Sequence, residues 1–307
     1  MTPRRLALSI AAVLVVSGLA LGGWYVHVSG GLPWTADSKA YQLLRQARQA
    51  ALREQRETAR GHLTTLFARY PATTWTAEAL WLNGELLERD GELLRAREAY
   101  QRIVTDFPHR PFAPQAQTAV ERVNVAVFCS PTITEEDQSY FVQPGDSLGA
   151  IARRFGTTVE LLKCANHLTS NLIRPQQQLK VVGGRFSILV DKSENTLVLK
   201  QNEAVIKQYV VATGDRNSTP VGTFTIVNRL VDPPWYTAKG LIPAGSPENI
   251  LGSRWLGLDK PGYGIHGTTD PMSLGKQSTA GCVRMLNADV EELFVIVPAG
   301  TPVTIND

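Results

Sequence analysis

The spacing of hydrophobic positions changes along the chain, and each change predicts a different kind of structure. Residues 6–26 contain no charged residue across 21 positions. A helix of this length spans about 31 Å, enough to cross the hydrocarbon core of a bilayer. In residues 36–128 apolar side chains recur at helical spacing. After residue 185 they alternate with polar ones, as in Phe186, Ile188 and Val190, which predicts short strands.

Positive charge precedes the apolar run and predicts its orientation. Arg4 and Arg5 lie on the short N-terminal side, which favours a cytoplasmic N-terminus (residues 1–5) and a transmembrane anchor (residues 6–26). The alternative is a cleaved signal peptide, which would need a cleavage site such as Gly18-Leu19-Ala20. Both alternatives export the rest of the chain. We therefore expect a single-pass cell-membrane protein whose domains lie on the periplasmic or extracytoplasmic side.

Residues 36–128 have a helical composition, with only three glycines and many Ala, Leu, Arg, Glu and Gln residues. Glycine weakens a helix by about 1 kcal/mol per position. A weak repeat relates residues 66–71 to residues 103–108, and in each copy an aromatic residue ends a helix and a proline forbids its continuation. This pattern resembles helical hairpins of the tetratricopeptide (TPR) type. Such an all-α region serves either as an arm for a protein partner or as a spacer, and the sequence leaves both open.

Residues 139–182 combine a short alternating strand, a turn and a capped helix. Gly145 and Asp146 form the turn, and Asp146 or Ser147 can cap the helix that follows. The predicted buried face of this helix consists of Leu148, Ile151, Ala152 and Phe155. The whole order resembles the LysM module, a small βααβ fold that binds N-acetylglucosamine-containing glycans such as peptidoglycan. One departure is Gln176, where that family commonly has glycine.

The segment from Gly264 to Met285 carries residues suited to covalent chemistry. His266 precedes Cys282 by sixteen residues. A cysteine nucleophile needs a nearby base or an ion-pair partner to react as a thiolate at neutral pH. The glycine before Cys282 lets the backbone approach a tetrahedral intermediate, and in an extended segment Arg284 points the same way as the thiol. These residues by themselves indicate a thiol acyl-transfer site with a carboxylate-binding fork.

The longer string around these residues is more specific. Together with residues 219–226 and 250–258, it resembles the catalytic domain of the L,D-transpeptidases (YkuD type), a mainly-β domain, over residues 185–307. The resemblance implies that Cys282 is the nucleophile and His266 the base. It also implies that the backbone carbonyl of Gly267 orients the imidazole.

The same resemblance assigns the remaining site residues. Backbone N–H groups of Gly281 and Cys282 would hold the oxyanion, and Arg284 and Thr279 would bind the substrate. Many relatives have histidine or lysine at the position of Ala280, so a base found there in those proteins is missing from this chain. The implied mechanism needs no metal and no cofactor.

The implied reaction is a two-step acyl transfer. Cys282 attacks the carbonyl of the diamino acid at stem position three and expels D-Ala. A second stem's side-chain amine then resolves the thioester, which gives a 3→3 crosslink. Water as acceptor would make the enzyme an L,D-carboxypeptidase, and a protein lysine would make it a wall-anchoring enzyme. A non-catalytic wall-binding anchor and a thiol protease on protein substrates are further alternatives.

Composition narrows the partners of this 307-residue chain. With 31 Lys and Arg against 28 Asp and Glu, the net charge of +3 gives little reason to expect nucleic acid. The expected partners are peptidoglycan, the membrane and a protein at the helical arm. Three cysteines are too few for a disulfide scaffold. In an oxidising exported setting, Cys129 and Cys164 either form a disulfide that clamps the linker to the LysM-like segment or stay free, and the sequence does not decide.

Overall fold

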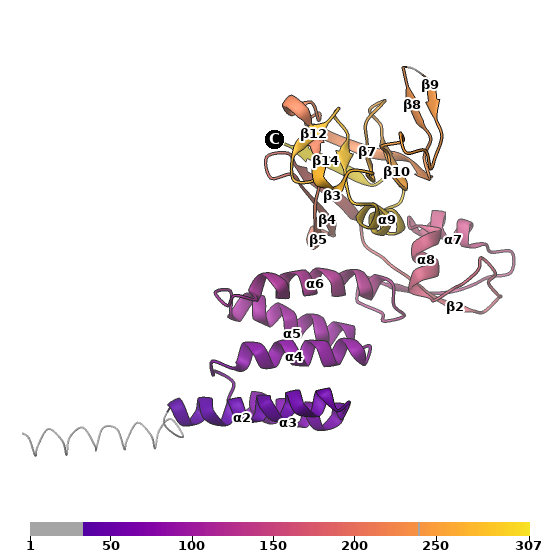
Figure 1. Cartoon of the computed structure of the whole chain (residues 1–307). Coiled ribbons are helices and arrows are strands. Elements are labelled where there is room, and N and C mark those ends of the chain that lie inside the picture. Colours follow the sequence, from indigo (N-terminus) through magenta and orange to yellow (C-terminus); the bar gives the residue numbers. More distant parts are fainter. Residues whose placement is uncertain (1–32, 239) are drawn as a thin grey trace, which may run out of the picture. The chain divides into compact units, whose positions relative to one another are not determined.

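The computed structural model describes residues 33–238 and 240–307 (Figure 1). They belong to two compact units, the first ending at Ala119 and the second running from Val120 to Asp307. The predicted cytoplasmic N-terminus and transmembrane anchor, residues 1–26, lie outside the described residues. Within the described ranges, no helix has both the length and the apolar character needed to cross a membrane.

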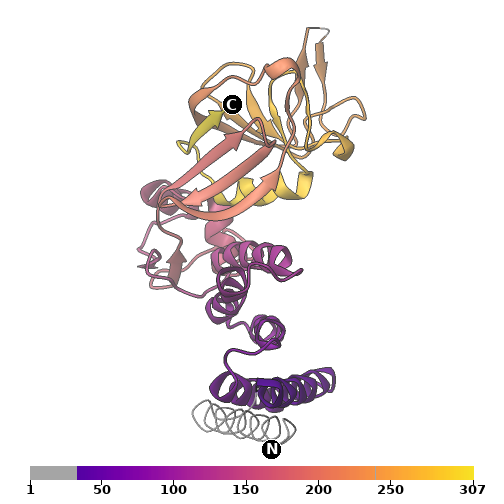
Figure 2. The same ribbon diagram turned by 90° about the vertical axis from the view of Figure 1, so that its left-hand side faces the viewer.

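Paired helices build the first unit, as Figure 2 shows. α2 (Pro33–Leu52) packs against α3 (Arg56–Arg69), and α4 (Thr76–Arg89) packs against α5 (Leu93–Asp106). α6 (Ala113–Phe128) begins in this unit and ends in the second. The prediction of a helical region is confirmed.

The helices end and approach one another for reasons visible in the sequence. Tyr70 is the C-cap residue of α3 and Phe107 that of α5, and a proline follows each of them. A Cβ atom on Gly84 would lie 2.6 Å from the ring of Tyr100, so the close packing of α4 on α5 requires glycine at this position. The buried core under α2, α3 and α4 includes Leu44, Leu63, Leu66, Ala79 and Leu86.

The second unit contains a small βααβ module. β1 (Gln138–Phe141) pairs antiparallel with β2 (Gln178–Val181), and α7 (Leu148–Phe155) and α8 (Val159–Ala165) lie between them in the chain. Its buried residues are Val142, Leu148, Ile151, Ala152, Leu162, Leu179 and Val181. The order of elements is the one predicted from the sequence.

Local polar contacts explain how this module starts and turns. Ser147 caps α7 by accepting a hydrogen bond from the N–H of Ala150. Asp146 instead accepts hydrogen bonds from the hydroxyl of Tyr140 and the N–H of Gln143. Gln176 adopts a φ of +66°, a left-handed conformation that favours glycine. The position where the LysM family commonly has glycine therefore demands a strained backbone here.

An eight-stranded mixed sheet forms the rest of the second unit, in the order β13-β11-β10-β7-β14-β3-β4-β5. The strands are β3 (Phe186–Asp191), β4 (Thr196–Gln201), β5 (Ala204–Val210), β7 (Gly222–Val231), β10 (Arg254–Leu258), β11 (Gly264–His266), β13 (Val283–Arg284) and β14 (Pro302–Asn306). The β3–β14 and β11–β13 pairs are parallel, and the other pairs in this sheet are antiparallel. β11 and β13, which carry or adjoin the candidate chemistry, lie together at one edge.

Shorter elements surround this edge. β6 (Thr213–Gly214) pairs with β12 (Gln277–Thr279). β8 (Trp235–Thr237) and β9 (Gly240–Ile242) form a hairpin that projects from the sheet domain in Figure 1. The 3-10 helices η1 (Asp215–Asn217) and η2 (Pro271–Ser273) lie in the connecting loops.

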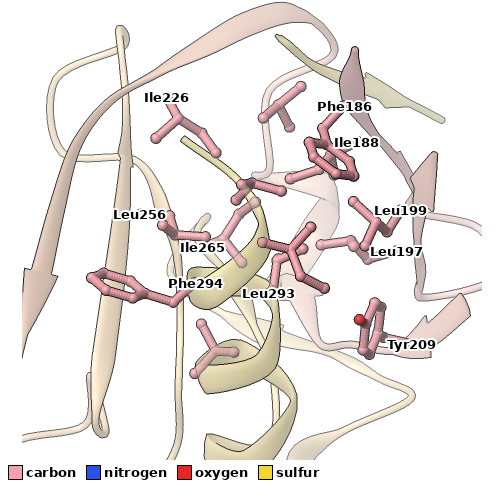
Figure 3. Close-up of a cluster of buried hydrophobic side chains, with 14 of the residues drawn as sticks. Phe186, Ile188, Leu197, Leu199, Tyr209, Ile226, Leu256, Ile265, Leu293 and Phe294 are labelled. Atoms are coloured by element: carbon pink, nitrogen blue, oxygen red, sulfur yellow. The ribbon is translucent and has the colours of Figure 1, made fainter. Parts of the chain in front are cut away.

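One helix of this domain was not predicted from the sequence. α9 (Asn287–Ile296) follows β13 directly and packs against β10 and β11. Leu293 and Phe294 of α9 lie in the same buried cluster as Leu256 and Ile265 of the sheet (Figure 3). Because α9 covers the strands that carry the candidate site, its position helps to fix theirs.

The βααβ module packs on the sheet domain through α8 and α9. The hydroxyl of Thr158, which caps α8, also donates to the carbonyl of Val295. Glu160 pairs with Arg229 of β7, with 3.3 Å between Oε2 and Nη2. Leu161 of α8 lies in the main core cluster of the sheet domain.

A disulfide joins Cys129, just after α6, to Cys164 in α8. The alternative in which both cysteines stay free is therefore excluded for this structure. Cys282 is the free cysteine among the described residues.

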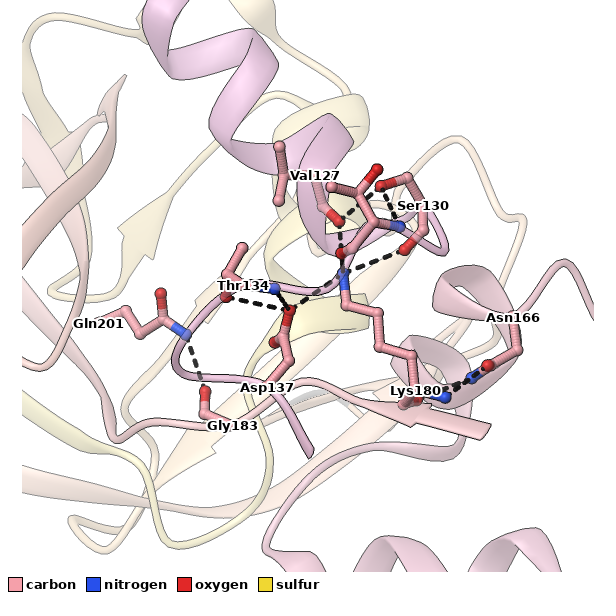
Figure 4. Close-up of polar contacts among 9 residues, drawn as sticks. Val127, Ser130, Thr134, Asp137, Asn166, Lys180, Gly183 and Gln201 are labelled. Atoms are coloured by element: carbon pink, nitrogen blue, oxygen red, sulfur yellow. Dashed lines mark hydrogen bonds and ion pairs between the residues drawn. The ribbon is translucent and has the colours of Figure 1, made fainter. Parts of the chain in front are cut away.

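A buried lysine also links the βααβ module to the end of α6 and the linker that follows it (Figure 4). The side chain of Lys180 in β2 is 2% exposed, and its Nζ lies 3.3 Å from Oδ2 of Asp137. The ammonium also donates to the carbonyls of Val127, Ser130 and Thr132, at 2.8, 3.0 and 2.5 Å. Burial lowers the pKa of Lys180, and the charge of Asp137 opposes that shift. A buried ammonium with four oxygen partners holds the end of α6 and the following linker against β2.

The disulfide predicts how many thiols react in the unfolded chain. Denatured, non-reduced full-length protein should take up one iodoacetamide adduct, on Cys282, and three after reduction, as measured by intact mass. Cys282→Ala should take up none before reduction and two after it. Complete alkylation of Cys129 and Cys164 without reductant would contradict the bridge.

Candidate active site

Parallel pairing of β11 with β13 brings the predicted site residues together. His266 is the last residue of β11 and is paired with Arg284, the last residue of β13. The N–H of Met285 donates to the carbonyl of His266 at 2.8 Å, which continues the pairing. Cys282 immediately precedes β13. Residues sixteen or more apart in the sequence therefore meet at one edge of the sheet.

A buried imidazole lies at this edge. His266 is 2% exposed, and its Nδ1 lies 2.7 Å from the carbonyl oxygen of Gly267. Because a carbonyl oxygen can only accept, this contact places the proton of the neutral ring on Nδ1. The indole of Trp255, opposite His266 on β10, stacks on the ring with 5.9 Å between centroids.

Burial determines the charge of this imidazole. It lowers the pKa of His266 to about 4, since the low-polarity surroundings disfavour the charged form. Hydrogen bonds to the backbone of Gly267 and Leu251 oppose the shift, while the positive charge of Arg284 adds to it. His266 is therefore neutral at pH 7.

Cys282 is half-buried beside this histidine strand. Burial raises the pKa of its thiol, and a backbone hydrogen bond from Gly264 and the charge of Arg284 act in the opposite direction. The thiol donates to the carbonyl of Gly262, with 3.5 Å between Sγ and the oxygen. Burial thus disfavours the charged form of both groups, the thiolate of Cys282 and the imidazolium of His266.

The loop before the thiol explains why glycine is needed there. Gly281 has a φ of +129°, and a Cβ atom on it would lie 2.9 Å from the ring of Tyr263. The hydroxyl of Thr279 donates to the carbonyl of Cys282 at 2.6 Å and accepts from the N–H of Gly281 at 3.2 Å. Thr279 is buried, so its contacts favour holding this loop over touching a substrate. Of the two predicted oxyanion donors, the Gly281 N–H is engaged in the resting structure.

Arg284 is half-buried and offers an unused donor. Its Nη1 donates to the hydroxyl of Ser273 at 3.0 Å, which fixes the guanidinium. Its Nε–H is buried and has no acceptor among the described residues. Such a group favours an anionic or carbonyl partner supplied by a ligand.

Two side chains at the site were not identified from the sequence. Neither Trp255, which stands within the family-like residues 250–258, nor Asn287 was predicted to be a site residue. The run from Asn287 to Phe294 does contain a helix signal, because apolar residues follow at positions 290, 293 and 294 after an asparagine. In the described ranges, no group of His, Cys, Asp and Glu side chains could hold a metal ion.

Comparisons with known proteins agree with these motifs. Residues 185–305 match the family described as the L,D-transpeptidase catalytic domain (YkuD), and residues 140–182 match the LysM domain. A protein from Bacillus licheniformis named L,D-transpeptidase YkuD is 39% identical over 174 residues, which cover 54% of this chain and 97% of that protein. An L,D-transpeptidase named YqjB from Bacillus subtilis is 41% identical over 126 residues, which cover 39% of this chain and 70% of that protein. The solved L,D-transpeptidase from Mycobacterium smegmatis is 18% identical, with a TM-score of 0.36 over 43% of this chain and 64% of that one.

The lowered pKa of His266 predicts acid sensitivity. Its pKa is about 4 when folded and 6.5 ordinarily, so the unfolded chain binds the proton more tightly between these values. The free energy of unfolding should therefore fall as the pH falls from 6.5 towards 4. The contribution of this group is about 3 kcal/mol at about 1.4 kcal/mol per pKa unit.

Chemical denaturation of the full chain and of His266→Asn at several pH values measures this contribution. The asparagine amide can still donate to Gly267, but it does not titrate. The difference between the two proteins should shrink or reverse on acidification. A difference that is constant between pH 7 and pH 4 would show that His266 does not titrate in this window.

Proposed function

The chain belongs to the L,D-transpeptidase family, and we propose that its Cys282 forms an acyl-enzyme with peptidoglycan stem peptides. The observation that carries this proposal is the neutral His266, tied through Nδ1 to Gly267, at the same sheet edge as Cys282 and Arg284. An imidazole whose proton lies on Nδ1 can act as a general base through Nε2.

In the first step, His266 takes the proton of the Cys282 thiol. The thiolate attacks the carbonyl carbon of the diamino acid at stem position three, which a peptide bond joins to D-Ala. The N–H of Cys282 has no acceptor among the described residues and supports the role of oxyanion donor. The tetrahedral intermediate then collapses, the C–N bond breaks, and the amine of D-Ala leaves with the proton from His266.

In the second step, the side-chain amine of another stem attacks the thioester. Its proton passes to His266, the carbon–sulfur bond breaks, and the thiol is restored as the 3→3 crosslink forms. Water in place of the amine would give an L,D-carboxypeptidase, and a protein lysine would give a protein anchored to the wall. The unpaired Nε–H of Arg284 supports its assignment as a donor to the stem peptide.

The LysM domain supports glycan binding beside the catalytic domain. An open hollow of about 500 Å³ lies between the end of α8 and the start of β2. Leu172, which lines it, is 76% exposed, and exposed apolar side chains next to amides suit the faces and hydroxyls of a sugar. The lining residues are Ser170, Leu172, Arg174, Pro175, Gln176 and Gln177.

The N-terminal part of the chain would position these domains. The uncharged run at residues 6–26 and the preceding Arg4 and Arg5 support a single-pass anchor with the domains outside the cytoplasm. The α2–α3 and α4–α5 hairpins, with their repeated aromatic-proline ends, support a TPR-like arm. Such an arm would bind a protein partner or space the enzyme from the membrane.

Reaction with a carbapenem tests the acyl-enzyme. Intact mass of the full chain should show one covalent adduct on the wild type and none on Cys282→Ala. His266→Asn should acylate about 100-fold or more slowly, because a general base contributes about 10²–10⁴-fold. No adduct on the wild type, or an equal adduct on Cys282→Ala, would refute the assignment and leave a non-catalytic wall-binding anchor.

Incubation with purified disaccharide-tetrapeptides then identifies the acceptor. Chromatography and mass spectrometry should show 3→3 dimers and free D-Ala. Tripeptides without dimers would indicate an L,D-carboxypeptidase. If neither product forms, both the transpeptidase and the carboxypeptidase proposals fail.

A further inference from the structure

Asn287, the first residue of α9, lies against the loops that hold His266. Its Oδ1 accepts a hydrogen bond from the N–H of Thr268 at 3.0 Å and another from the N–H of Ser253 at 3.2 Å. Thr268 follows the His266-Gly267 pair, and Ser253 precedes β10, which pairs with β11. One side-chain oxygen therefore joins the two loops on either side of the histidine.

The contact to Thr268 reaches the histidine through a single peptide group. The N–H of Thr268 and the carbonyl of Gly267 belong to the same planar unit. The carbonyl of that unit accepts from Nδ1 of His266 at 2.7 Å. A continuous chain therefore runs from Asn287 Oδ1 through this peptide to the imidazole. Hydrogen bonds in such a chain polarise one another, so the acceptor at one end strengthens the contact at the other.

Two glycines, Gly267 and Gly252, lie close to the side chain of Asn287. A Cβ atom on Gly267 would lie 2.1 Å from Asn287 Oδ1, and one on Gly252 would lie 2.2 Å from it. Gly252 also has a φ of +65°, a conformation that favours glycine. A side chain at either position would displace Asn287 Oδ1, and at Gly252 its Cβ would also lie 2.5 Å from the backbone nitrogen of Thr268.

We propose that Asn287 is a positioning residue, which holds the Gly267–Thr268 peptide so that His266 keeps its proton on Nδ1 and presents Nε2 to the thiol. The inference rests on the proposed function, because it takes His266 to be the base. Asn287 does not touch the reacting atoms. It acts through the peptide next to the histidine, and α9 fixes it in place.

Two substitutions separate this role from general packing. Asn287→Leu has a similar size and removes the acceptor, whereas Asn287→Asp keeps an oxygen in its place. Histidine-selective ¹⁵N labelling of the full chain, with His266→Asn to identify the signal, reports which ring nitrogen carries the proton at pH 7. The wild type and Asn287→Asp should show a protonated Nδ1, and Asn287→Leu should shift the proton towards Nε2.

The rate of carbapenem acylation provides the second readout. We expect Asn287→Leu to lose about 100-fold, the size expected when a catalytic group is misplaced. Asn287→Asp should stay within about tenfold of the wild type. Asn124→Leu is the matched control, because the buried amide of Asn124 donates to the carbonyl of Ile206 on the opposite edge strand, β5. It should leave both readouts unchanged.

A folded Asn287→Leu protein with the wild-type tautomer and acylation rate would overturn the proposal. If that variant does not fold, Asn287→Ser replaces it, since a shorter hydroxyl cannot reach both N–H groups, and the same outcomes apply. A wild type that no carbapenem acylates would refute the proposed function instead. The tautomer measurement would then still decide whether Asn287 positions His266.

Discussion

The hydrogen bond from His266 Nδ1 to the carbonyl of Gly267 determines what the other parts of the site can do. It fixes the ring against its own backbone and places the proton of the neutral ring on Nδ1. The parallel pairing of β11 with β13 then places Arg284 beside His266, and Cys282 immediately precedes β13. Gly252 and Gly267 leave room for the side chain of Asn287, and Gly281 leaves room for the ring of Tyr263.

Burial is the dominant electrostatic effect at both reacting groups. It lowers the pKa of His266 and raises the pKa of Cys282, so each group is driven towards its neutral form. The charge of Arg284 favours the thiolate but disfavours an imidazolium. In the proposed reaction, proton transfer and attack on the substrate are therefore expected to occur together, since burial disfavours both the thiolate and the imidazolium. As a consequence, protonation of His266 in acid lowers the free energy of unfolding of the chain.

Local sequence determines part of this structure, and contacts between distant residues determine the rest. His266, Cys282 and the glycine before the thiol stand in short strings that carry the chemistry, and the φ of +129° at Gly281 favours glycine at that position. The caps at Ser147, Tyr70 and Phe107 are local in the same sense. Gln176, at the position where LysM domains commonly have glycine, still adopts the left-handed backbone conformation that glycine favours.

What could not be predicted depends on three-dimensional contacts. Asn287 meets N–H groups that lie 19 and 34 residues earlier, so its role follows only from the way α9 packs on the sheet. The Cys129–Cys164 bridge spans 35 residues, and its alternatives could not be separated without geometry. The family resemblance implied that Thr279 binds substrate, yet its hydroxyl is used within the loop.

Burial at the site favours a neutral thiol and a neutral imidazole over a thiolate–imidazolium pair. The rate of Cys282 alkylation by iodoacetamide, measured against pH on the folded, non-reduced full chain, distinguishes these two states. With a neutral thiol, we expect the rate to keep rising above neutrality, with its midpoint above the ordinary thiol pKa of about 8.5. A rate that is already at its plateau between about pH 5 and pH 8 would instead reveal a thiolate–imidazolium pair and rule out the neutral pair.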